Sequence, residues 1–89
     1  MIETLDLFSG IGGFSLGLES TGHFRTIGFC EIEAFPREVL AHHWPGVPIW
    51  EDVRTLTGKE VLSEAGANHA LRDEPDTARR VDLICGGFP

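Results

Sequence analysis

The stretch that decides the fold is TLDLFSGIGGFSLGLE, residues 4–19. Residues 2–8 are mostly apolar and too few for a typical helix, so they predict a buried strand. Three glycines then fall within four positions, at Gly10, Gly12 and Gly13. Glycine reaches positive φ without steric cost and lets a ligand approach the backbone closely. This stretch therefore predicts a strand that runs into a tight turn with room for a ligand.

A helix is expected directly after the turn, with Phe14, Leu16 and Leu18 on its apolar face. A strand, a glycine turn and a helix in this order are typical of a cofactor cradle, because the helix directs free N–H groups at the turn. The common dinucleotide fingerprint also requires glycine at its sixth position, which is Ser15 when counted from Gly10. The pattern therefore disfavours a pyrophosphate and leaves two readings, another nucleotide-like cofactor or a plain turn without a ligand.

The composition is that of one small globular domain. The chain has 89 residues, of which 42% are hydrophobic and 24% charged, and its net charge is −7. This sign disfavours a chain that grips nucleic acid unaided, because phosphate contacts need Lys and Arg. Cys30 and Cys85 lie in apolar runs far apart and are expected to be reduced and buried. Neither a membrane span nor a targeting segment is evident.

The rest of the chain alternates between strand-like and helix-like segments. Strands are expected at residues 24–31, 47–50 and 81–85, and helices at residues 34–44 and 58–66. This order predicts an α/β fold, a partial Rossmann-like parallel sheet of about four strands with flanking helices.

Two further expectations concern side chains outside the strands. The helix at residues 34–44 is expected to bury Phe35, Val39, Leu40 and Trp44. Its adjacent histidines would point to different faces, so no metal site is expected there. Residues 67–80 are polar and of mixed charge, which indicates a surface loop.

Ligands of parallel sheets bind beyond the carboxyl ends of the strands. That rule gathers four distant places, namely the glycine turn, Glu31-Ile32, Asp52-Val53 and residues 86–89. The last of these, Gly-Gly-Phe-Pro, is weak evidence by itself.

The two carboxylates at these strand ends are the strongest candidates for polar contacts with a nucleoside. Glu31 is placed to accept hydrogen bonds from two ribose hydroxyls. The alternatives are that it binds backbone N–H groups at a helix start, or that Glu33 takes its place. Asp52 is placed to accept an adenine amino proton, with an N-cap of the following turn as the alternative.

Apolar residues beside these carboxylates are candidates to enclose a flat base. Ile32 and Val53 would sandwich the ring, and the ring of Phe8 would cover the cofactor unless it belongs to the core. Asp6 lies within an apolar run, where an unpaired carboxylate is costly. It is expected to orient the glycine turn through backbone N–H groups.

With these residues assembled, the chain resembles the beginning of a DNA cytosine-5 methyltransferase. DLFSGIGGF at residues 6–14 matches the first motif of that family nearly letter for letter. Glu31 and Asp52 fall where the acidic residues of the second and third motifs belong, and residues 86–89 match the front half of the fourth. The resemblance covers the chain except for residues 67–80.

The resemblance implies that the whole chain, residues 1–89, is the amino-terminal part of an S-adenosylmethionine-binding catalytic domain. Phe8 and the turn with Gly10, Gly12 and Gly13 would hold the methionine portion. Glu31 would take the ribose hydroxyls and Asp52 the adenine amino group. The remaining contacts would be packing by Ile32 and Val53 on the ring, and closure of the site by Gly86 and Phe88.

The resemblance also implies what this sequence lacks. In the family the fourth motif continues Pro-Cys-Gln after the glycines, and that cysteine attacks C6 of a flipped-out cytosine. Here the sequence stops at Pro89, and Cys85 lies too early on its strand to replace the missing thiol. The 89 residues alone are therefore expected to be inactive, with DNA contacts supplied by a missing carboxyl-terminal part.

Several roles for such a chain stay open at this point. It is a fragment, a truncated reading frame, or half of a split enzyme completed by a second chain. A stand-alone cofactor-binding or regulatory module is the alternative in another class. A nucleotide-dependent oxidoreductase domain is less favoured because the glycine fingerprint is incomplete. The family setting would be restriction-modification in a bacterium or phage.

Overall fold

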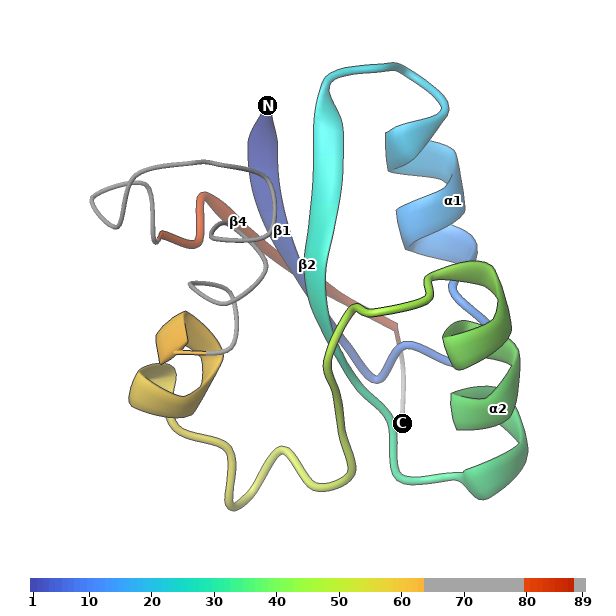
Figure 1. Ribbon diagram of the computed structural model, residues 1–89, viewed down its shortest axis with the longest axis vertical. Coiled ribbons are helices and arrows are strands. Elements are labelled where there is room, and N and C mark those ends of the chain that lie inside the picture. Colours follow the sequence, from blue (N-terminus) through green and yellow to red (C-terminus); the bar gives the residue numbers. More distant parts are fainter. Residues whose placement is uncertain (64–79, 88–89) are drawn as a thin grey trace.

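The computed structural model describes residues 1–63 and 80–87. Its centre is one parallel four-stranded sheet in the order β3-β2-β1-β4 (Figure 1). The strands are β1 (Ile2–Leu7), β2 (Phe24–Cys30), β3 (Ile49–Trp50) and β4 (Leu83–Gly86). The predicted α/β class is confirmed, while β3 and β4 each begin two residues later than the sequence indicated.

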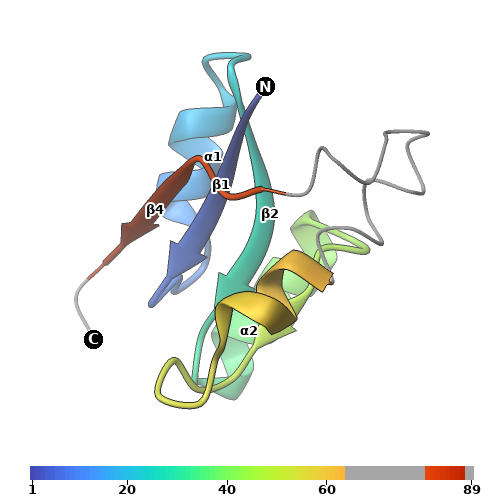
Figure 2. The same ribbon diagram turned by 90° about the vertical axis from the view of Figure 1, so that its left-hand side faces the viewer.

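Helices lie on both faces of this sheet. On one face are α1 (Gly13–Glu19) and α2 (Ala34–His43). Residues 58–63 form helical turns on the opposite face (Figures 1 and 2). The rest of the helix expected at 58–66, and all but the last residue of the loop expected at 67–80, lie outside the described residues. Within the described part, no helix is long and apolar enough to cross a membrane.

The core lies mainly between β2 and the helices α1 and α2. Phe29 and Leu40 are fully buried, and the ring of Phe29 meets that of Trp44 edge-on at 5.1 Å. The indole nitrogen of Trp44 donates to the Glu19 carboxylate at 3.0 Å, which joins the last turn of α1 to the end of α2. These contacts hold both helices against the sheet and so set where their connecting loops lie.

The buried face of α1 differs from the prediction. The helix buries Ser15, whereas Phe14 and Leu16 are 56% and 66% exposed. The reason is Asp6, which is fully buried on β1 and accepts a hydrogen bond from the Ser15 hydroxyl at 2.7 Å. A buried carboxylate without a donor is costly, so this bond orients the helix more strongly than its apolar residues do.

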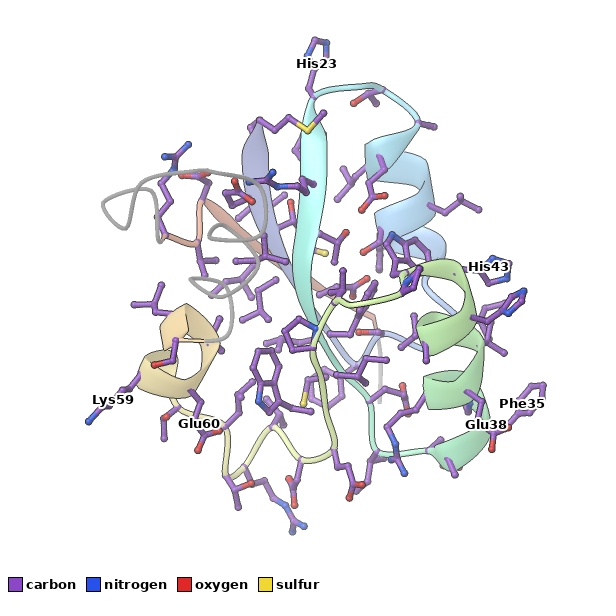
Figure 3. The ribbon with its side chains drawn as sticks, viewed as in Figure 1. His23, Phe35, Glu38, His43, Lys59 and Glu60 are labelled. Carbon is purple, nitrogen blue, oxygen red and sulfur yellow. The ribbon has the colours of Figure 1, made fainter. Side chains whose placement is uncertain are left out.

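The prediction for α2 is also wrong at one position. Leu40 is buried as expected, but Phe35 is 70% exposed. Figure 3 shows Phe35, Glu38 and His43 projecting from α2 away from the sheet. Phe35 belongs to the first turn of α2, which begins just beyond the carboxyl end of β2 at Cys30.

Candidate functional site

The turn after β1 has an unusual backbone. Phe8 has a φ of 52°, and it is the single non-glycine residue in the described ranges with a positive φ. Gly10 and Gly12 follow with φ values of 56° and 91°. A bulky residue in the left-handed region is a true outlier, and such strain persists only where the surroundings hold it.

Three hydrogen bonds hold the strained turn. The Ser9 N–H donates to the Cys30 carbonyl at 3.1 Å, and the Ser9 hydroxyl donates to the Asp6 carbonyl at 2.5 Å. The Gly10 N–H donates to Oε1 of Glu31 at 2.8 Å. The end of β2 therefore positions the glycine turn of β1, and the Glu31 carboxylate is part of that support.

Glu31 is buried, with 9% of its surface exposed. Its second oxygen, Oε2, accepts a hydrogen bond from the Glu33 N–H at 2.8 Å. These are the backbone contacts weighed as the alternative to ribose binding. A carboxylate oxygen has two lone pairs, so each oxygen of Glu31 retains acceptor capacity for a ligand hydroxyl. Its role toward ribose stays a prediction.

A pocket of about 580 Å³ opens at this carboxyl edge of the sheet. In Figure 1 this edge is the lower one, where β1 and β2 end. The pocket brings together six of the residues predicted for the site: Phe8, Gly10, Glu31, Ile32, Asp52 and Val53. Its volume lies within the range of small-molecule sites. Residues from three strand ends thus form one cavity.

The other predicted site residues that the structure describes, Gly12, Gly13 and Gly86, do not line this pocket. Gly12 packs against α2, where an added Cβ would lie 2.6 Å from the Trp44 ring. At Gly86 an added Cβ would lie 2.9 Å from the Leu7 carbonyl oxygen, so this glycine permits close pairing of β4 with β1. Gly13 has open space around it, and Phe88 lies outside the described residues.

Asp52 is held by its neighbour Arg54. The guanidinium group of Arg54 lies 2.8 Å from Oδ2, and the Arg54 N–H donates to Oδ1 at 2.9 Å. The hydrogen bonds and charge of Arg54 lower the pKa of Asp52, which is therefore ionised at neutral pH. The local turn contact matches the alternative reading of Asp52, so its role toward adenine also stays a prediction.

Sequence reasoning missed five residues in the pocket wall, namely Cys30, Glu33 as a lining residue, Pro36, Glu51 and Arg54. Four of them directly flank the two predicted strand-end segments, so widening each segment by one residue would have found those four, whereas Pro36 lies farther along α2. Their charges matter, because the wall contains four carboxylates and one guanidinium group. The pocket is therefore acidic and disfavours phosphate groups.

Three titratable side chains near the strand ends are Asp6, Cys30, which lines the pocket, and Cys85. Burial raises the pKa of Asp6, and hydrogen bonds from Ser15 oppose that rise. Oδ1 of Asp6 has no hydrogen-bond partner, so its principal contact is the Ser15 hydroxyl rather than the N–H groups of the turn. Burial also raises the pKa of both thiols, Cys30 and Cys85, which are free; Cys30 is buried and Cys85 half-buried.

No group of three or more potential metal ligands occurs among residues 1–63 and 80–87. His42 and His43 are exposed on the last turn of α2, with their ring centroids 5.2 Å apart. The two rings meet edge-on, so they lie closer together than the expectation of different faces implied.

The fold and the pocket define a class, an α/β domain with a pocket of small-molecule size at the carboxyl edge of a parallel sheet. Comparison with protein families identifies the family within this class. The model of the C-5 cytosine-specific DNA methylase family matches residues 2–89. The chain therefore belongs to the C-5 cytosine-specific DNA methylase family, as the resemblance of its motifs indicated.

Several curated relatives agree with this assignment. The chain is 34% identical to the type II methyltransferase M2.BsuMI of Bacillus subtilis over 99% of its own length and 18% of that protein. It is 34% identical to M1.HphI of Haemophilus parahaemolyticus over 96% of its length and 20% of that protein. It is 28% identical to DNA (cytosine-5)-methyltransferase 1 of Gallus gallus over 99% of its own length and 6% of that protein. The chain thus spans a fifth or less of these relatives.

Proposed function

We propose that this chain binds S-adenosylmethionine as the cofactor-binding part of a DNA cytosine-5 methyltransferase. The proposal rests on one observation. Three strand ends that are distant in the sequence line one pocket, to which they contribute Phe8, Gly10, Glu31, Ile32, Asp52 and Val53. Family membership supplies the reaction class, and the pocket supplies a place for the cofactor.

In the proposed complex, different residues of the pocket would contact the ribose, the purine and the methionine portion of the cofactor. Glu31 has acceptor capacity on both oxygens for the ribose hydroxyls. Asp52 would accept from the purine amino group, with Ile32 and Val53 against the ring. The methionine portion would lie toward Phe8 and the turn with Gly10, Gly12 and Gly13, and Gly86 and Phe88 would close the site. Gly12 and Gly86 do not line the pocket, and instead they permit close packing against Trp44 and the Leu7 carbonyl group.

The charge of the pocket supports a cationic ligand. Four carboxylates line it, from Glu31, Glu33, Glu51 and Asp52, against the guanidinium of Arg54. A sulfonium cation is favoured by such a field, whereas a pyrophosphate is repelled. When bound, S-adenosylmethionine supplies an electrophilic methyl group on that sulfonium. The task of these residues is to bind and orient it.

Methyl transfer to C5 of cytosine needs a thiol that the two cysteines described here do not provide. Burial raises the pKa of both Cys30 and Cys85, which disfavours the nucleophilic thiolate. We assign the attacking thiol to a cysteine that would follow Pro89, and the DNA contacts to residues beyond it, in this or a second chain. The 89 residues alone are predicted to be inactive. A cytoplasmic role in restriction-modification belongs to the same proposal.

Isothermal titration with S-adenosylhomocysteine and with NAD tests the cofactor. The expected result is binding of S-adenosylhomocysteine and none of NAD, since the acidic wall repels its pyrophosphate. Binding of NAD alone would instead favour the oxidoreductase alternative. A methyl-transfer assay on cytosine-containing DNA tests the second part. Methylation by the 89-residue chain alone would refute the assignment of the missing thiol.

A further inference from the structure

Arg54 engages nearly all of the acceptor capacity of Asp52. Its backbone N–H and its Nε donate to Oδ1 at 2.9 and 3.0 Å, which fills both lone pairs of that oxygen. Its Nη2 donates to Oδ2 at 2.8 Å, and Nε lies 3.2 Å from the same oxygen. At most one lone pair of Oδ2 is left for a ligand. The carboxylate that the pocket offers to a purine amine is therefore already occupied.

The two carboxylates of the pocket differ in what occupies them. Glu31 is bound by main-chain N–H groups of Gly10 and Glu33, which the fold holds in place. Asp52 is bound largely by a side chain that is 80% exposed. An exposed ion pair contributes little stability, because water and salt screen it. The guanidinium of Arg54 is therefore exchangeable, whereas the partners of Glu31 are not.

From this contrast we infer that Arg54 competes with the ligand for Asp52. It holds the carboxylate in the empty pocket and releases at least Oδ2 when a purine amino group arrives. The inference rests on the proposed function, since it names Asp52 as the acceptor for the purine. Arg54 is a residue that sets affinity and its salt dependence, and it takes no part in the reaction.

The chain offers a matched control. Arg80 pairs with Asp82 two residues away, as Arg54 does with Asp52, at 3.0 Å and with 54% of the arginine side chain exposed. Arg80 does not line the proposed cofactor pocket. Arg80→Ala removes the same charge from the same kind of ion pair without touching the site. Arg54→Lys keeps the positive charge but loses the bidentate contact of the guanidinium with the Asp52 carboxylate.

The test is titration of wild type and the three variants with S-adenosylhomocysteine, which carries no net charge, at about 20 mM and about 500 mM salt. At low salt Arg54→Ala is expected to bind about two- to fivefold more tightly than wild type, Arg54→Lys to fall between them, and Arg80→Ala to match wild type. At high salt the wild type should bind S-adenosylhomocysteine more tightly than at low salt, so that its affinity becomes equal to that of Arg54→Ala.

Equal or weaker binding by Arg54→Ala at low salt would overturn the inference while leaving the proposed function in place. Binding by none of the four proteins would remove the proposed function, and the inference with it. A ligand-free measurement adds a second check, because carbon NMR of the Asp52 carboxyl should show its pKa rise in Arg54→Ala. An unchanged pKa would mean that the ion pair does not form in solution, which also overturns the inference.

Discussion

The three glycines of the first turn should respond very differently to the same substitution. Gly12 has a φ of 91°, and an added Cβ would lie 2.6 Å from Cζ3 and 2.7 Å from Cη2 of Trp44. Gly10 has a φ of 56° with nothing within 4 Å of an added Cβ. Gly13 has neither a positive φ nor a close neighbour. The series therefore separates backbone strain from steric clash.

The magnitudes follow from those two terms. Alanine in the left-handed region costs about 1–2 kcal/mol, which is the whole expected loss for Gly10→Ala. Gly12→Ala bears the same cost and also overpacks the Trp44 ring, which adds about 1–3 kcal/mol. The expected loss in unfolding free energy is thus about 2–5 kcal/mol. Gly13→Ala lies at the start of α1 and should be close to neutral, since alanine favours the helix.

Urea unfolding followed by far-UV circular dichroism measures all three variants, and this signal avoids relying on the fluorescence of Trp44 itself. A domain of this size is only marginally stable, so complete unfolding of Gly12→Ala alone would agree with the order expected. A Gly12→Ala variant as stable as Gly10→Ala would refute the reasoning, because the contact with Trp44 would then contribute nothing.

Two further predictions concern the carboxylates. Glu31→Ala should weaken binding of S-adenosylhomocysteine by about 1–3 kcal/mol through lost charge-assisted hydrogen bonds. Glu33→Ala should have little effect in the same titration. A larger loss of affinity in Glu33→Ala than in Glu31→Ala would assign the ribose contact to Glu33. Because burial raises the pKa of Asp6 above 3.8, the native state binds its proton more tightly than the unfolded chain, and stability falls as pH rises from 3.8 through the raised pKa. Asp6→Asn should flatten that fall in urea unfolding measured across pH, and an unchanged slope would assign it to another group.

Much of the architecture was predictable because strand and helix periods are local properties of the chain. The alternation of apolar runs with helical segments indicated the parallel sheet, and the rule on strand ends predicted that Glu31 and Asp52 share one edge of it. The motif at residues 6–14 indicated the family, which the family comparison confirmed.

The failures arise where a contact between distant residues outweighs local pattern. Phe14 and Leu16 look like a buried helix face, yet Asp6 draws Ser15 inward because a buried carboxylate needs a donor. Gly12 stays a predicted site residue, and the structure adds a packing role that the sequence did not reveal, because an added Cβ would lie 2.6 Å from the Trp44 ring.

The amino-acid sequence by itself determined the strand order along the chain, the family, and which strand ends carry carboxylates, since these depend on residue type and spacing. Only the tertiary structure decided which of those residues share a pocket and which donors already occupy them. A hydrogen bond forms only when donor and acceptor lie about 3 Å apart, as the Gly10 N–H and Glu31 do, and the guanidinium of Arg54 and Asp52. Whether two groups lie that close depends on the folded backbone.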